Sequence, residues 1–274
     1  MSFAKFIKKP IFACTIVIFL FLMNFSAYAI KMNIDPPRVK LSISPGGTES
    51  GYVTVLNYDQ NETIHVKVYV NDLVYAPDGS NDFLPEGTTP WTAADWLKIG
   101  PTEFDLGPSD QMKVRYVVEV PEDAKGGRYG VVFFEISPPA DELSATTGAS
   151  INIRLGSIFL VTVKGAESYD VELQGLKVSK PDEDGAFDIS CTVRNNSNIL
   201  VRPSGPVKII DSSKTEVAEL LLNSQDGGIF PRTNREFTVR YDKKKLAPGE
   251  YFVQAVLDYG GEDYLGGQIS FNVK

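Results

Sequence analysis

Apolar residues recur at every second position over most of this 274-residue chain. The segment from Gly46 to Leu73 shows the rhythm twice, first in a run that ends at Asn57 and then, after a polar break, in the run that starts at Ile64. A period of two is typical of a β-strand with one face in a core. Apart from one helical turn expected at residues 92–96, nothing after the first 30 residues has helical spacing, so the sequence predicts an all-β protein.

The alternating runs divide into two sets. The first set covers residues 36–43, 51–57, 64–73, 97–99, 104–106, 113–120, 129–136 and 151–163. The second covers residues 169–178, 186–195, 207–210, 218–222, 235–241, 251–257 and 268–273. Short strands separated by turn residues at roughly 8 to 12 positions are the signature of a β-sandwich.

Both sets contain the same two local motifs. Thr54-Val55-Leu56-Asn57 is echoed by Thr192-Val193-Arg194-Asn195, and Gly127-Arg128-Tyr129 by Gly249-Glu250-Tyr251. We expect each Asn to cap its strand through its own side chain, and each Tyr to enter a core with its hydroxyl at the rim.

The echo predicts two immunoglobulin-like β-sandwiches in tandem. They are expected to span residues 30–164 and 165–274, with the boundary in Lys164-Gly165-Ala166-Glu167. A single large barrel is the alternative, and the usual size of domains disfavours it.

The N-terminus has the composition of a targeting segment. Lysines precede an apolar run from Ile11 to Met23, which is shorter than the roughly 20 residues of a membrane span. Ala27-Tyr28-Ala29 follows as a cleavage site, so residues 1–29 are predicted to be a removed signal peptide. An uncleaved anchor is the alternative. No later segment is apolar enough to span a bilayer, and we expect a periplasmic protein, or else a secreted or cell-surface one.

The charge balance excludes some partners. The chain has 27 basic and 35 acidic residues, and three lysines leave with the signal peptide, so the net charge becomes −11. Nucleic acids and anionic membrane surfaces attract basic proteins. Neither is therefore an expected partner.

Reactive side chains are scarce. Cys191 is the only cysteine after the signal peptide and is expected to be a buried apolar residue, while His65 is the only histidine. Zinc sites need several such ligands, and there is no nucleophile elbow or phosphate-binding glycine loop. Asp182 and Asp184 fit part of a calcium loop, but its twelfth position is Val193 where glutamate is required. The sequence therefore predicts a protein that is not an enzyme and has no cofactor or metal.

A long irregular stretch follows the third strand, from Val74 to Trp96. Loops of this length are usually functional or mobile. Trp91 and Trp96 are candidate interface anchors on it. The alternative, which we favour, is that both indoles tuck under the loop as a small satellite core.

Three segments carry a resemblance to a known family. They are DPPRVKLSISPGGTESGYVTVLN, WLKIGPTEFDLGPSDQMKVRYVVEVP and GGRYGVVFFEI. In arrangement they resemble the N-terminal domain of the PapD-like periplasmic pilus chaperones, over about residues 34–163. The second set of strands matches that family only in being a sandwich.

The resemblance implies a binding site. In that family an edge strand with alternating apolar residues completes the open sheet of a pilin-like subunit, while an Arg and a Lys grip the subunit's C-terminal carboxylate. The Arg falls on Arg38, and the edge strand falls on GASINIRLGSIFLVTV, in which one face carries Ile151, Ile153 and Leu155. Gly156 is expected to bulge this strand.

One element of the family pattern is missing. The Lys should fall near Phe159 or Leu160, and neither residue is basic. Arg154 and Lys164 are the nearest cations.

Three hypotheses follow, of which the least favoured is a hydrolase without any recognised motif. The first is an exported chaperone-like protein that binds an extracytoplasmic subunit with an incomplete sheet by strand addition. The second is a structural or adhesive module for cell-surface assembly, without chaperone activity, that uses the aromatic residues of the 74–96 loop.

Overall fold

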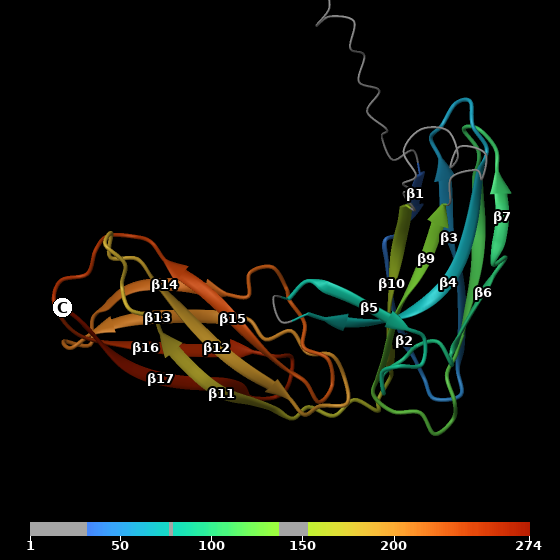
Figure 1. Cartoon of the computed structure of the whole chain (residues 1–274). Helices are drawn as coiled ribbons and strands as arrows, with labels where there is room; N and C mark the ends of the chain where they lie inside the picture. The colour runs from blue at the N-terminus through green and yellow to red at the C-terminus, as the bar shows by residue number, and fades with distance from the viewer. Residues whose placement is uncertain (1–31, 77–78, 137–152) are drawn as a thin grey trace, which may run out of the picture. The chain divides into compact units, whose positions relative to one another are not determined.

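Strands make up all the regular structure that the computed structural model describes, which covers residues 32–76, 79–136 and 153–274 (Figure 1). Within these ranges there are seventeen strands and no helix that could cross a membrane. The expected helical turn at residues 92–96 is not a helix: Thr92 forms a bridge with Tyr129, and residues 93–96 form one turn in which Leu97 N donates to Ala93 O at 3.0 Å. The predicted signal peptide, residues 1–29, lies outside the described residues.

The first sandwich consists of two sheets built from the first ten strands. Sheet 1 has the order β1 (Met32–Asp35), β3 (Thr48–Asn57), β8 (Gln111–Glu119), β6 (Leu97–Gly100). Sheet 2 has the order β2 (Arg38–Ile43), β10 (Ile153–Val163), β9 (Gly127–Ile136), β4 (Ile64–Tyr75), β5 (Asn81–Pro85), and β7 (Glu103–Leu106) also pairs with β4. Alternate residues of both sheets fill the space between them, among them Val53, Val66, Phe134 and Phe159.

The second sandwich has all seven strands predicted for it. Sheet 3 has the order β11 (Val171–Val178), β12 (Phe187–Asn195), β15 (Asn234–Tyr241). Sheet 4 has the order β14 (Glu216–Leu222), β13 (Gly205–Asp211), β16 (Gly249–Asp258), β17 (Tyr264–Val273). Cys191 is fully buried in the core between them, and burial raises the pKa of its thiol to about 11. Cys191 is therefore a buried apolar residue, as expected.

In the described residues no strand of the first sandwich pairs with a strand of the second, which confirms the tandem-sandwich fold. A third cluster of buried residues joins them, and we call it the junction cluster. In it Phe230 packs with Leu73, Trp91, Tyr129 and Leu160. The residues from Met32 to Lys274 form one compact unit. The boundary at residue 164 remains a prediction.

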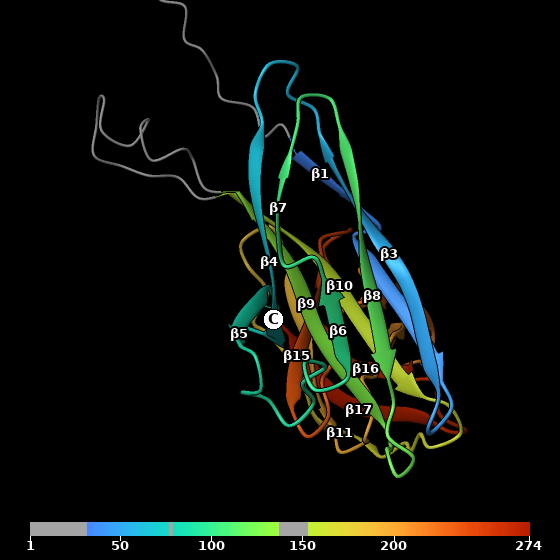
Figure 2. The same ribbon diagram turned by 90° about the vertical axis from the view of Figure 1, so that its right-hand side faces the viewer.

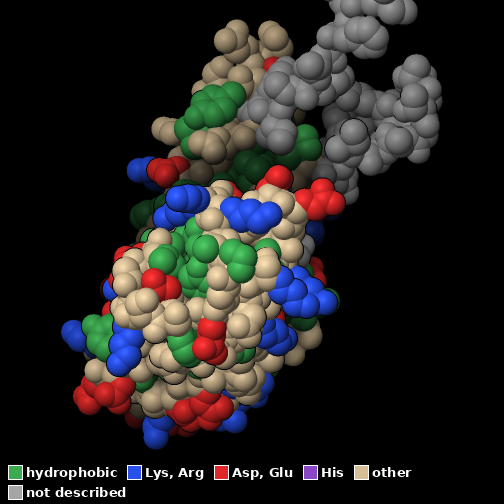
Figure 3. Space-filling view, turned by 90° about the vertical axis from the view of Figure 1, so that its left-hand side faces the viewer, with side chains coloured by type: hydrophobic (Ala, Val, Ile, Leu, Met, Phe, Trp, Pro, Cys, Tyr) green, Lys and Arg blue, Asp and Glu red, His purple; other side chains and the backbone are tan. Residues whose placement is uncertain are grey.

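Figure 3 shows one face of the second sandwich, on which hydrophobic side chains gather between charged ones. The large hydrophobic residues most exposed in this sandwich include Leu221 and Tyr264, at 57% and 67%. Single exposed hydrophobic residues are common on protein surfaces. They do not by themselves indicate a binding site.

The first strand was predicted to begin at residue 36, but in the structure β2 begins at Arg38. Pro36 and Pro37 interrupt the chain, because proline has no N–H to donate to a ladder. The residues before them, β1, pair with β3 in sheet 1, and the residues after them, β2, pair with β10 in sheet 2. The chain therefore changes sheets at this point.

The long loop contains structure that the sequence did not reveal. β4 continues to Tyr75 and pairs with β5, which lies inside the expected loop. Asp72, fully buried, accepts hydrogen bonds from Thr89 N at 2.6 Å, Thr89 Oγ1 at 2.9 Å and Thr92 Oγ1 at 2.5 Å. This carboxylate ties residues 89–92 to β4.

The two tryptophans of this loop are buried. Trp96 belongs to the core of the first sandwich, and Trp91 belongs to the junction cluster, with Nε1 donating to Leu73 O at 3.1 Å. Neither indole is an exposed anchor, because both rings already pack inside the protein. The alternative prediction of a small satellite core is therefore correct for Trp91, whereas Trp96 belongs to the main core of the first sandwich.

The repeated asparagine motif acts as predicted. Asn57 Nδ2 donates to the carbonyls of Glu62, Leu106 and Gly107, and its Oδ1 accepts from Asp59 N. Asn195 makes the corresponding bonds at the end of β12, donating to Ile199 O and Ile229 O and accepting from Ser197 N.

The two tyrosines of the second motif differ. Tyr251 enters the core of its sandwich, and its hydroxyl donates to Ala247 O at 3.0 Å. Tyr129 instead packs in the junction cluster, where its hydroxyl accepts from Leu200 N at 2.6 Å. The expectation of a core tyrosine holds for Tyr251 only.

Candidate functional site at the edge of β10

β10 pairs with β9 on one side along nearly its whole length, whereas on the other side β2 covers only its second half (Figures 1 and 2). It pairs with β9 from Ile153 to Thr162, whereas its parallel pairing with β2 begins at Ile158. No other described strand pairs with residues 153–157. We call these five residues the β10 rim.

Backbone direction alternates along the rim. Ile158 N donates to Pro37 O at 3.0 Å on the β2 side, and Val163 N donates to Gly126 O at 2.8 Å on the β9 side. Because successive residues of a strand point their N–H and C=O groups to opposite sides, Arg154 and Gly156 point theirs away from β9. The rim therefore presents two residues with hydrogen-bonding groups in position for a further strand.

The apolar side chains of the rim are only half buried. Ile153 and Leu155 face the same side of the sheet as the core residue Phe159, and Leu155 packs against that core. Ile151 lies outside the described residues. The predicted alternation of apolar residues is therefore present at the two described positions.

Gly156 does not bulge the strand, so that expectation was wrong. The pairing with β9 runs in continuous register, with Gly156 opposite Phe133. A Cβ on Gly156 would lie 2.7 Å from Val131 Cγ2 and 3.0 Å from Phe133 Cε1. The glycine is needed because neighbouring side chains occupy the outer face there.

Arg38 lies where the rim ends. It is the first residue of β2, is exposed, and is the register partner of Ile158 in a parallel pair. Paired residues share a face, and Ile158 packs against the junction cluster. Among the described residues Arg38 has no ion-pair partner.

A second exposed cation, which the sequence reasoning did not single out, lies on β2 close to Arg38. Phe159 and Leu160 are buried, at 0% and 9% exposure, and neither is basic. The register partner of Leu160 is Lys40, which is exposed and follows Arg38 by two residues on the same face. The alternation within β2 was the signal that would have found it.

The described residues offer little other chemistry. No group of three His, Cys, Asp or Glu side chains in them has metal-binding geometry. Asp182, from the partial calcium motif, accepts from Ala186 N at 2.9 Å and pairs with Arg240 at 2.6 Å, and the hydrogen bond from Ala186 contributes most to lowering its pKa. Asp182 is therefore a turn residue.

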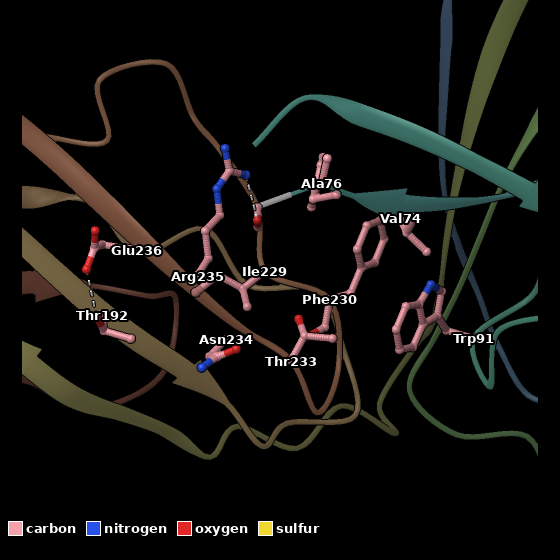
Figure 4. Close-up of a pocket in the computed structure, with 12 residues that line it drawn as sticks. Val74, Ala76, Trp91, Thr192, Ile229, Phe230, Thr233, Asn234, Arg235 and Glu236 are labelled. Carbon is pink, nitrogen blue, oxygen red and sulfur yellow. Dashed lines mark hydrogen bonds between the residues drawn. The ribbon is translucent and has the colours of Figure 1, made fainter. Parts of the chain in front are cut away.

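A cavity of about 550 Å³ lies beside the junction cluster (Figure 4). Its apolar wall includes Trp91 and Phe230, whose rings stack with centroids 5.2 Å apart. Arg235 also lines it, donating to Gly79 O at 3.3 Å and to Gly228 O at 3.0 Å. The aromatic rings of the cavity therefore stack on each other, and the Arg235 guanidinium is already bonded to backbone carbonyls.

No protein-family profile and no curated protein matches this chain. Among solved structures, it is similar to the class 5 fimbriae chaperone CfaA, at 16% identity and a TM-score of 0.47, over 86% of this chain and 98% of that one. The E. coli chaperone DraB matches at 14% identity and 0.39, over 89% and 97%. A structure of the Salmonella enterica SafA pilin in complex with the SafB chaperone matches at 14% and 0.41, over 89% and 99%.

All three structures contain chaperones. The identities are too low to transfer a function.

Proposed function

We propose that this protein is an exported, non-enzymatic chaperone that binds a subunit with an incomplete β-sheet by adding a strand to it at the β10 rim. The observation that supports this best is that, among the described strands, residues 153–157 pair on one side only, next to the start of β2, where Arg38 has no ion-pair partner among the described residues. Open strand edges that carry apolar residues are otherwise an aggregation hazard, and proteins usually shorten or charge them.

In this proposal the backbone supplies affinity and the side chains supply fit. The outward N–H and C=O groups of Arg154 and Gly156 bond to the partner's strand. Ile153 and Leu155, with Ile151 before them, fill its apolar groove. Such augmentation uses main-chain bonds for affinity and alternate side chains for specificity.

Arg38 and Lys40 are proposed to hold a carboxylate of the partner. Two exposed cations on one face, adjacent to the end of the rim, suit an anion at the end of the incoming strand. Charge-assisted hydrogen bonds of this kind are stronger than neutral ones. Lys40 takes the place that the family's lysine would occupy on β10.

The partner is proposed to be a pilin-like subunit in the periplasm. Residues 1–29, as a signal peptide, would direct this chain to the same compartment. The rival, an adhesive module without chaperone activity, depends on exposed aromatic residues in the 74–96 loop. Burial of Trp91 and Trp96 removes its main support.

A labelled peptide tests strand addition. The probe is a fluorescein-labelled peptide of about eleven residues, with apolar residues at alternate positions and a free C-terminus; binding is followed by fluorescence anisotropy. We expect Ile153→Asp to weaken binding at least tenfold, because a charge would have to enter an apolar groove. The milder Ile153→Ser should weaken it less, and a urea midpoint checks that each variant folds.

The matched control is Ile269→Asp, the same change at a half-buried position on another edge strand, β17. It should leave binding unchanged. Equal binding by wild type and a folded Ile153→Asp variant would contradict strand addition.

The same peptide with a C-terminal amide tests the anion site. We expect wild type to prefer the carboxylate peptide by about tenfold, since a charged hydrogen bond contributes about 1.5–3 kcal/mol. Arg38→Met should remove the preference, and Lys40→Met should reduce it. No preference in wild type would exclude this role for Arg38 and Lys40 while leaving the rim intact.

A further inference from the structure

The β10 rim is expected to fray, because it lies at the end of a strand at the edge of its sheet. Among the described strands, only β9 pairs with its residues, and such strand ends open locally at low cost. A rim that frays presents its N–H and C=O groups in many directions. Binding a partner would then require ordering the rim first, which lowers the apparent affinity.

Arg154 makes contacts that hold the rim against its neighbour. Its guanidinium carbon lies 4.7 Å from the ring centroid of Phe133 on β9 and 5.8 Å from that of Phe83 on β5. The two rings meet edge to face, with centroids 4.8 Å apart and planes at 84°. Arginine over an aromatic face is an attractive cation–π contact. A single side chain of the rim thus contacts two further strands of the sheet.

A fourth strand joins this arrangement through Tyr69 of β4. Its ring centroid lies 5.7 Å from that of Phe133, and its hydroxyl donates to Glu135 Oε2 at 2.5 Å. The Arg154 guanidinium lies close enough to this hydroxyl to influence its pKa. Burial raises the pKa of the Tyr69 hydroxyl, Glu135 raises it further, and Arg154 acts in the opposite direction.

Gly156 makes room for the cluster. A Cβ at position 156 would lie 2.7 Å from Val131 Cγ2 and 3.0 Å from Phe133 Cε1, so a side chain there would displace one or both. The outer face of the rim is therefore shaped by Phe133 below Arg154.

We propose that Arg154 is a positioning residue, which keeps the β10 rim flat on β9 before a partner strand arrives. The inference rests on the proposed function of the rim. Arg154 does not select the partner in this account. It presents the backbone groups of residues 154 and 156 in a fixed register, so that the partner binds a preformed edge.

Amide hydrogen exchange measured by NMR tests the positioning. Leu155 and Ser157 point their N–H groups to β9, so their exchange reports how often the rim opens. In Arg154→Met, which keeps much of the stem and removes the cation, we expect both amides to exchange at least tenfold faster. Arg154→Lys should be intermediate.

The matched control is Lys67→Met on β4. Lys67 is exposed on the same face of the sheet as Arg154 and is the register partner of Glu135. Its Nζ lies 4.0 Å from Glu103 Oε1. Exchange of Leu155 and Ser157 should be unchanged in this variant. Equal rates in wild type and Arg154→Met would overturn the inference.

The peptide probe links positioning to function. We expect Arg154→Met to weaken binding of the free-carboxylate peptide about tenfold, mainly by slowing association, because fewer molecules have a formed rim. Faster exchange with unchanged peptide affinity would also overturn the inference. Strand addition itself fails on a different result, namely binding that a folded Ile153→Asp variant does not weaken.

Discussion

Two buried asparagines close corresponding strand ends in the two sandwiches. Asn57 and Asn195 are 2% and 0% exposed, and each side chain satisfies backbone groups of the turn that follows. Leaving such groups unpaired costs about 1–3 kcal/mol each. Their role was predictable because the motif repeats and because asparagine bonds to its own local backbone. The alternation within β2 indicates that Lys40 shares a face with Arg38, but its place opposite Leu160 follows only from strand register.

The single histidine gives a pH-dependent prediction. His65 Nδ1 lies 2.6 Å from Asp105 Oδ1 and Nε2 lies 2.7 Å from Glu103 Oε1, and these bonds, Asp105 first, raise its pKa above 6.5. The bonds therefore stabilise the fold fully below about pH 6.5, and the contribution is lost as pH rises through the raised pKa. The ring is 43% exposed, so solvent keeps the effect small.

An NMR titration of the His65 ring measures this pKa directly. Asp105→Asn should lower it, and Asp123→Asn, in a distant turn, should leave it unchanged. A midpoint at or below 6.5 in wild type would contradict the geometry of this cluster.

At the scale of elements, alternation predicted nearly all the strands but not how they meet. β5 was missed because its sequence, Asn-Asp-Phe-Leu-Pro, has no alternation, and long-range contacts to β4 and the buried Asp72 hold it in place. The β10 rim was not predictable either. It exists because Pro36 and Pro37 turn the chain away, so that β2 pairs with β10 only from Ile158 onward.

The rim glycine gives a prediction for the element as a whole. Gly156→Ala would place a methyl group 2.7 Å from Val131 Cγ2, and such overpacking typically costs about 1–3 kcal/mol. A lower urea midpoint at an unchanged slope would show it. Gly266→Ala on β17, where a Cβ meets nothing within 4 Å, should be neutral or slightly stabilising. Equal stability of the two variants would contradict the packing described for the rim.

For the whole molecule, long-range contacts fix the placement of the site. Ser157 Oγ donates to Pro36 O at 2.8 Å across 121 positions of sequence, and Tyr129 accepts from Leu200 N across 71. No local pattern reports such contacts. Alternation along the sequence therefore predicts the class of fold and the candidate strand, whereas only the structure shows the open side of that strand and the two exposed cations at its end.

Amide exchange at the rim in the presence of the alternating peptide tests the central claim most directly. The amides of Arg154 and Gly156, which point away from β9, should exchange fast in the free protein and at least tenfold more slowly once the peptide is bound. Protection of Leu155 and Ser157 should change little. Peptide binding that leaves the amides of Arg154 and Gly156 exchanging at their free rates would contradict the account.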